Sequence, residues 1–339
     1  MATIKDIARI TGYSIGTVSR VMNHHQDVSD KARKEIEQVI EEQGYQPNAN
    51  AKLLKQTHTN SITVFIKSTC NIFLNGMLEN IQSMLKQAGE EVKVVFMDEN
   101  SDEVLAAKRI CHDNHPRGLL FLGADLDHFR HEYEEMGVPA VLVAADGNGL
   151  HIDSLSSYCT DDDAGARAAA EYLIDHGHRH IGLLGGVDPD VQGQVAYKRY
   201  HGLSSCLKEH NLSFVRSRQY IPCEFSLEGG YEAGKNLLHT FPEVTAVFCM
   251  SDTVAIGAMR AFSEAGRRIP EDVSVIGFDG IDYSQFTVPR LTTVCQDTET
   301  IVRSSVNDLL MRIKTDAPSR HSMVPFHIVE GESVCQLSK

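Results

Sequence analysis

The sequence predicts a small all-α N-terminal domain followed by an α/β core of two lobes, each built on a parallel sheet. Residues 3–23 have the apolar spacing of two short helices joined by a tight turn, and a polar stretch follows at 47–60. From residue 61 onward, short apolar runs alternate with amphipathic segments, as strands and helices do. The alternation occurs in two successive series, one for each lobe. We expect strands at 62–66, 92–96, 118–122, 140–143, 181–184, 246–249, 273–277 and 291–295, and helices at 73–88, 101–113, 126–136, 164–176, 197–210, 231–240 and 253–265.

The first two helices have recognisable start signals. Thr3 can cap the first helix, and Asp6 favours the positive end of its dipole. Gly12 supplies the backbone freedom for the turn, and Ser14 can cap the second helix. Ser29 begins a third helix, which ends at Gly44. A shared core is expected from Ile4, Ile7, Ala8, Val18, Val21, Met22, Ala32, Ile36, Val39 and Ile40.

Two short helices joined in this way typically hold one of them in the major groove of DNA. The outer face of the second helix offers an arginine that can pair with guanine, an apolar side chain suited to a thymine methyl, and short donors for phosphates. The alternative is an ordinary helical hairpin with a solvated polar face. The residues of this face are Ile15, Gly16, Thr17, Ser19, Arg20 and Asn23.

The run TIKDIARITGYSIGTVSRVMN, the segment YQPNANAKLL and three later motifs resemble the lactose-repressor (LacI/GalR) family of bacterial transcription regulators. The later motifs are SDTVAIG at 251–257, VIGFD at 275–279 and LTTV at 291–294. The resemblance covers essentially the whole chain. It implies a helix-turn-helix headpiece, a periplasmic-binding-protein-like core that senses a small molecule, and a homodimer, with a tetramer left open, on a pseudo-palindromic operator.

The resemblance also assigns roles in DNA binding. It places Ile15, Gly16 and Arg20 at base-reading positions, while Leu54 would enter the minor groove as an apolar wedge. Leu53 and Leu54 could instead be packing residues under the core. The full set of candidate DNA contacts is Thr3, Ser14, Ile15, Gly16, Thr17, Ser19, Arg20, Asn23, Asn48, Ala51 and Leu54.

Effector contacts are expected just beyond the carboxyl ends of the strands, where open parallel sheets bind ligands. Sugar hydroxyls suit planar partners such as Arg199 and Asp279, and aromatic rings can stack on a pyranose. We expect Asp252 to cap its helix rather than touch ligand, and Asp279 could instead hold its own loop. By the resemblance, the candidate effector contacts are Phe73, Arg199, Phe225, Ser251, Asp279 and Gln296.

The match is uneven among these positions. Arg199 and Gly202 reproduce the family's Arg-x-x-Gly, although a register slip would bring in Lys198 or His201 instead. Around Phe73 the chain reads Asn-Ile-Phe-Leu, where the family usually has Asn-Pro-Phe-Phe.

Two clusters suggest metal chemistry, and neither is expected to bind a metal. The imidazoles of His176, His178 and His180 lie on the approach to a strand, where alternate side chains need not converge. The acidic run 161–163 is expected to start a helix at the crossover between the lobes. Gly185-Gly186 lacks the further glycine and acidic residue of a dinucleotide site. We therefore expect no catalytic residue, metal or cofactor; a transport-type sugar-binding protein and an α/β enzyme are the competing function classes.

The charge is acidic overall but unevenly placed. The net charge is −14, yet residues 1–57 hold eight Lys/Arg against seven Asp/Glu, so the acidic excess lies in the core. The eight cysteines include no Cys-x-x-Cys pair and are expected to be reduced core thiols. With no signal peptide and no apolar run long enough for a membrane, a cytoplasmic location is expected.

The expected domains are a headpiece at 1–46, a hinge helix and linker at 47–60, and an effector-binding and dimerisation core at 61–339. The N-lobe should comprise about 61–161 and 295–322, and the C-lobe about 162–294 and 323–339. A ligand in the cleft would favour one orientation of the lobes and so change the affinity for the operator. The sequence leaves open whether the ligand lowers this affinity, as an inducer, or raises it, as a corepressor.

Because Gly16 has no side chain to read a base, direct readout should depend on Ile15 and Arg20. Arg20→Ala should therefore cost roughly 1–3 kcal/mol at one base pair of the operator. Fluorescence anisotropy against single-base operator variants measures this loss. An equal loss on every sequence would show that Arg20 contacts only the backbone.

Overall fold

The computed structural model describes residues 4–22, 28–43, 61–67, 71–98, 101–133, 136–186, 190 and 194–337. Contacts between residues divide the chain into two units, Met1–His58 and Thr59–Lys339. The hinge expected at 47–60, with Asn48, Ala51 and Leu54, lies outside the described residues, as do Thr3 and Asn23.

The described part of the N-terminal unit consists of α1 (Ile4–Thr11), α2 (Ile15–Met22) and α3 (Asp30–Glu42). Gly12 has a φ of +70° at the turn, and the Ser14 hydroxyl accepts a hydrogen bond from the Thr17 amide at 3.1 Å. The Ser29 hydroxyl accepts one from the Ala32 amide at 3.4 Å. The buried apolar residues at the centre of this unit are Ile7, Ala8, Val18, Val21 and Ile36. The predicted helices, turn and two caps are thus confirmed.

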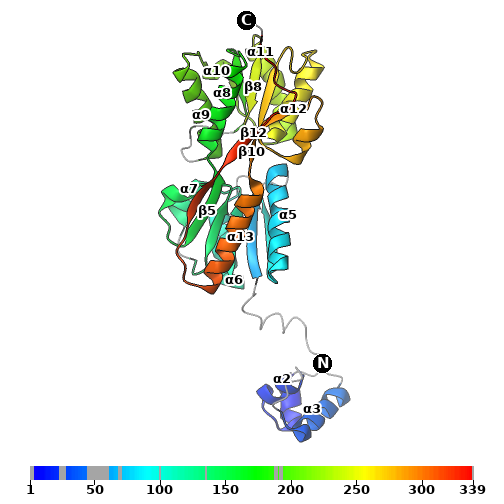
Figure 1. Cartoon of the computed structure of the whole chain (residues 1–339). Coiled ribbons are helices and arrows are strands. Elements are labelled where there is room, and N and C mark those ends of the chain that lie inside the picture. The colour runs from blue at the N-terminus through cyan, green and yellow to red at the C-terminus, as the bar shows by residue number, and fades with distance from the viewer. Residues whose placement is uncertain are drawn as a thin grey trace. The chain divides into compact units, whose positions relative to one another are not determined.

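The first sheet of the core has the strand order β11-β5-β4-β3-β1-β2, and every pairing in it is parallel. Apolar clusters cover both faces, with α5 and α13 on one and α6 and α7 on the other. Both helical layers are visible in Figure 1. The elements are β1 (Ser61–Lys67), α5 (Ile72–Gln87), β2 (Glu91–Met97), α6 (Glu103–Asn114), β3 (Gly118–Leu122), α7 (Leu126–Glu132), β4 (Ala140–Val143), η1 (Asn148–Leu150), β5 (Leu155–Thr160), α13 (Thr298–Lys314) and β11 (His321–Val324).

The second sheet repeats this topology, with the order β12-β10-β9-β8-β6-β7. Among the described strands of this sheet, only β10 and β12 pair antiparallel. Helices α8 and α9 pack on one face, and α11 and α12 on the other. The elements are α8 (Asp162–Asp175), β6 (Ile181–Leu184), α9 (Val195–Glu209), α10 (Arg216–Gln219), β7 (Tyr220–Ile221), α11 (Leu227–Thr240), β8 (Ala246–Cys249), α12 (Asp252–Glu264), β9 (Ser274–Asp279), η2 (Asp282–Phe286), β10 (Thr292–Gln296) and β12 (Phe326–Val329).

The chain crosses between the lobes at three single residues. Asp161 connects β5 to α8, Asp297 connects β10 to α13, and Pro325 connects β11 to β12. Asp161 and Asp297 also cap the helices that follow, accepting hydrogen bonds from Ala164 and Thr300. The expected crossings near 295 and 323 are therefore moved slightly, because β10 stays in the C-lobe sheet to Gln296 and β11 in the N-lobe sheet to Val324.

The two-lobed α/β class is confirmed, while some elements were missed. Buried serines and threonines interrupt the apolar pattern of β5, and β7 has only two residues. The strand expected at 273–277 runs on to Asp279 as β9. Across the described ranges, every helix is too short or too polar to cross a bilayer.

Helices α11 and α12 pack with their backbones in close approach, because glycines face the neighbouring main chain. A methyl group on Gly257 would overlap the carbonyl oxygen of Leu227 and the amide nitrogen of Tyr231. A methyl group on Gly76, in α5, would meet nothing within 4 Å. Both glycines lie in helices, but Gly257 has no room for a side chain whereas Gly76 does.

Gly257→Ala should lower the free energy of unfolding by about 1–3 kcal/mol, because the facing backbone cannot move aside easily. Gly76→Ala is the matched control and should raise it by about 0.5–1 kcal/mol through lower backbone entropy. Urea unfolding of both variants tests the pair. Equal effects would contradict the close packing of α11 on α12.

Candidate functional site

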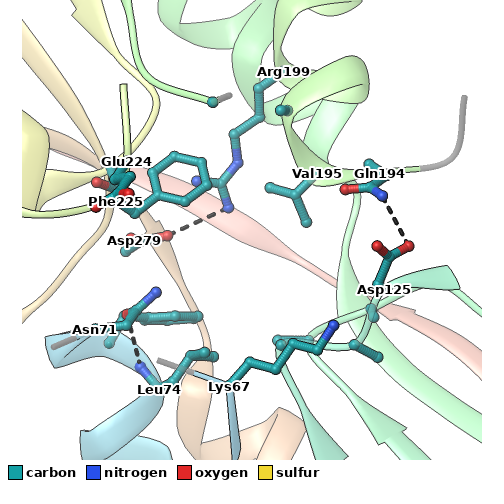
Figure 2. A pocket seen from close by; sticks show the side chains of 18 of the residues that line it. Lys67, Asn71, Leu74, Asp125, Gln194, Val195, Arg199, Glu224, Phe225 and Asp279 are labelled. Carbon is teal, nitrogen blue, oxygen red and sulfur yellow. Dashed lines mark hydrogen bonds and ion pairs between the residues drawn. The ribbon is translucent and has the colours of Figure 1, made fainter. Parts of the chain in front are cut away.

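A cavity of about 500 Å³ lies where the carboxyl ends of the two sheets face each other. Lys67, Ser251, Asp279 and Gln296 reach it from the ends of β1, β8, β9 and β10. This position follows from the topology, since parallel sheets of this order bind ligands beyond their carboxyl edges. Figure 2 shows the cavity with side chains from both lobes. The structure places all six candidate effector residues on its wall: Phe73, Arg199, Phe225, Ser251, Asp279 and Gln296.

Arg199, on α9, organises the C-lobe side of the cavity. Its Nε donates to Asp162 Oδ1 at 2.8 Å, and its Nη2 lies 3.3 Å from Asp279 Oδ1. Nη1 donates to the carbonyl of Met250, and the guanidinium lies 3.7 Å from the ring centroid of Phe278. The side chain is 6% exposed, so its charge is compensated by buried partners rather than water.

The structure also shows that the neighbours of Arg199, Lys198 and His201, do not take its place in the cavity wall. Lys198 donates to Asp146 at 2.8 Å, and Asp146 belongs to the other lobe. His201 bonds Asp163 at 2.6 Å on the surface. Only Arg199 of the three faces the cavity.

Asp279 sits at the end of β9 in an unusual backbone conformation. Its φ is +114°, which for a residue with a side chain costs on the order of 1–3 kcal/mol. Gln296 Nε2 donates to its Oδ1 at 2.8 Å, and Arg199 approaches the same atom. Burial raises the pKa of Asp279 to about 6, although Arg199 opposes the shift. The carboxylate is thus held in a strained, desolvated position at the wall of the cavity.

The expectation for Asp252 was wrong. Ser251 caps α12, because its hydroxyl accepts the Val254 amide at 3.2 Å. Asp252 instead accepts hydrogen bonds from the amides of Gly280 and Ile281, at 2.8 and 2.9 Å. The Thr293 hydroxyl donates to it at 2.6 Å, and burial raises its pKa well above the ordinary value. It therefore supports the loop after Asp279 rather than the helix end.

The two aromatic candidates, Phe73 and Phe225, differ in how deeply they are buried. Phe73 is 9% exposed and packs in the N-lobe core, whereas Phe225 is half-buried. The Asn71 side chain caps α5 by accepting the Leu74 amide at 3.1 Å, so the helix begins as required despite the departure from Asn-Pro-Phe-Phe. Contact of these six residues with an effector stays a prediction.

Among the described residues, two side-chain hydrogen bonds join the lobes. Gln194 Nε2 donates to Asp125 Oδ1 at 2.9 Å, as the dashed line in Figure 2 shows. The second is the bond from Lys198 to Asp146. Both bonds therefore link the lobes at residues that line the cavity or adjoin its lining in sequence.

Sequence reasoning missed several polar lining residues, chiefly Lys67, Asp125, Gln194 and Glu224. Lys67 is the last residue of β1 and directly follows the strand expected at 62–66, so the rule on strand ends could have found it. The other three lie in loops. No periodic pattern marks such positions, and Glu224 follows a strand of only two residues.

His178, from the histidine cluster of the sequence, and a separate acidic group in the N-lobe have hydrogen-bond or ion-pair partners in the protein. His178 is buried between the Thr245 hydroxyl and the Cys335 carbonyl, both at 3.2 Å, and burial lowers its pKa to about 4. Asp102, Glu103 and His128 come together in the N-lobe. However, Lys67 Nζ lies 2.7 Å from Glu103, and the Asp102 side chain caps α6. These carboxylates are thus engaged by the protein itself.

In the N-terminal unit, α2 and the residue that caps it, Ser14, present several candidate DNA contacts to solvent. Ser14, Gly16 and Arg20 are exposed, and Thr17 is half-buried with its hydroxyl 2.9 Å from that of Ser14. Ile15 and Ser19 belong to the same helix.

The fold and the cavity define a two-lobed ligand-binding core in a chain that begins with a helix-turn-helix. Residues 3–48 match the model of bacterial regulatory proteins of the lacI family, and residues 170–334 match the periplasmic binding protein-like domain. The chain is 31% identical to the HTH-type transcriptional regulator MalR of Clostridium butyricum over 335 residues, which covers 97% of this chain and 98% of MalR. It belongs to the lacI family of bacterial regulatory proteins, which are DNA-binding transcription regulators and not enzymes.

Solved structures agree over nearly the whole length. A complex of the transcriptional regulator CelR with cellobiose has a TM-score of 0.71 and 26% identity, covering 98% of this chain and 100% of that one. The lac repressor dimer bound to operator and the anti-inducer ONPF has a TM-score of 0.69 and 27% identity, covering 98% and 99%.

The raised pKa of Asp279, about 6, makes stability depend on pH. Between about pH 4 and 6 the folded chain keeps a proton that the unfolded chain has released, so this group's contribution to the free energy of unfolding falls as pH rises. Asp279→Asn should therefore gain about 1–3 kcal/mol relative to wild type across this window, and then level off.

Urea unfolding at stepped pH measures this difference. Asp272→Asn is the control with the opposite sign, because Arg268 lowers the pKa of Asp272 and its contribution is lost as pH falls. Parallel curves for wild type and Asp279→Asn would contradict the assignment.

Proposed function

We propose that this protein represses carbohydrate-utilisation genes as a cytoplasmic homodimer on a pseudo-palindromic operator, with its affinity switched by a small sugar in the cleft. The observation that supports this most directly is the cavity of about 500 Å³ whose wall comes from both lobes. Because a ligand there contacts the two lobes at once, it can favour one lobe orientation over another.

The chemistry of the wall suits a polyhydroxylated ligand. Asp279 and Gln296 offer acceptors and an amide, Arg199 offers planar donors, and Phe225 offers a ring face. The rings are few and the polar groups many, which matches the mixed surface of a sugar.

The domain boundaries in this proposal are a headpiece at 1–46, a hinge at 47–60 and a core from 61. Ile15 and Arg20 read bases, while Gly16 occupies a base-reading position without a side chain. Ser14, Thr17, Ser19 and Asn23 contact phosphates, and Leu54 enters the minor groove. In the dimer, the orientation of the core lobes sets whether both headpieces can bind one operator. The effector favours one of these orientations. The effector therefore changes the affinity of the protein for the operator, and the operator changes its affinity for the effector by the same factor.

Arg199→Lys should keep operator binding and lose the response to effector by tenfold or more, because lysine keeps the charge but not the planar donor set. Fluorescence anisotropy with a genomic fragment selected by the full chain measures operator affinity, stoichiometry and the effect of each sugar. Arg218→Lys is the control, since Arg218 pairs with Glu243 on the exposed surface of the same lobe.

Two chains per fragment and a shift in affinity with sugar are the expected wild-type results. If every sugar that binds the core leaves operator affinity unchanged, the cleft is not the switch.

A further inference from the structure

The two cations among the described residues of the cavity wall, Lys67 and Arg199, are paired with buried carboxylates. Lys67 Nζ lies 2.7 Å from Glu103, with side chains 7% and 2% exposed. Arg199 contacts both Asp162 and Asp279, and all three of its nitrogens face an acceptor of the protein. Little of either positive charge is therefore left for a ligand.

The acidic groups of the wall outnumber these cations. The lining also holds Asp125, Asp127 and Glu224, of which Asp127 pairs with Arg130 at 2.9 Å. Glu224 is exposed, and its carboxylate makes no hydrogen bond or ion pair with any described residue. Counted with their ion-pair partners, the cations are Lys67, Arg130 and Arg199, and the anions are Glu103, Asp125, Asp127, Asp162, Glu224 and Asp279.

The neighbouring segments add no positive charge. The stretches 68–70, 187–189 and 191–193 adjoin lining residues in sequence, and they contain no lysine or arginine. The nearby Lys198 is bound to Asp146. An anion entering the cleft would thus meet a net negative wall whose cations are engaged.

Glu224 is the most accessible of these carboxylates. It lies between β7 and α11, beside Phe225 and on the same side of the cavity as Asp279, as Figure 2 shows. Asp125 belongs to the other lobe, where its carboxylate accepts the hydrogen bond from Gln194. Carboxylates accept hydrogen bonds from hydroxyl or ammonium groups but repel a phosphate or a second carboxylate.

Resting on the proposed function, we propose that the effector is a sugar without negative charge, and that Glu224 is a specificity-determining residue that excludes sugar phosphates and uronates. A neutral or amino sugar donates hydrogen bonds to Glu224, Asp279 and Asp125. An anionic sugar of the same skeleton loses these bonds and gains repulsion.

The test is a matched ligand panel on the full chain. Glucose, galactose, mannose, ribose, maltose and cellobiose are compared with available amino, phosphate and uronate counterparts, by thermal shift and then by calorimetry. At least one neutral or amino sugar should bind at least about tenfold more tightly than its anionic counterpart. Glu224→Gln should narrow that ratio several-fold, whereas Glu232→Gln, at an exposed glutamate of α11 outside the cavity, should leave it unchanged.

Tighter binding of a phosphate or uronate than of its parent sugar overturns the proposal, as does an unchanged ratio in Glu224→Gln. Binding of no member of the panel also overturns it. Operator binding by the same preparation is measured in parallel, so loss of this inference is distinguished from failure of the proposed DNA-binding function.

Discussion

The guanidinium of Arg199 is the constraint on which the C-lobe wall of the cleft depends. It holds α9 against α8 through Asp162, against the end of β8 through the Met250 carbonyl, and against the end of β9 through Asp279. Two buried carboxylates share this one cation. Removing Arg199 would leave both buried carboxylates without a cation, so the same side chain fixes the positions of these elements and balances their charge.

The hydrogen bonds of Asp252 support the residues that Arg199 contacts. Asp252 holds the amides of Gly280 and Ile281 and the hydroxyl of Thr293, which fixes the loop after Asp279 and its distance from β10. Gly277 makes room for this carboxylate, because a side chain there would overlap Asp252. The strained φ of Asp279 is therefore maintained by partners on both sides of the strand.

Much of this architecture was readable from the sequence, and the failures have physical causes. Apolar runs such as 118–122 and 181–184 became central strands, because a strand buried on both faces has a continuous apolar sequence. Beyond such strands, the positions of Arg199, Asp279 and Gln296 came from a rule on topology together with the family resemblance. The role of Asp252 could not be predicted in this way. An aspartate at the start of a helix is expected to cap it, and the sequence does not show that its carboxylate binds the backbone of another loop. Likewise, Glu224 and Gln194 depend on loop conformation, which leaves no periodic trace in the sequence.

The three crossings between the lobes have a mechanical consequence. Each passes through one residue, and two of these residues cap helices while the third is a proline with a restricted φ. Three short tethers side by side resist twisting and sliding far more than a single long linker does. Such tethers restrict how the lobes can move relative to each other, so a ligand bound between the lobes acts on few relative motions.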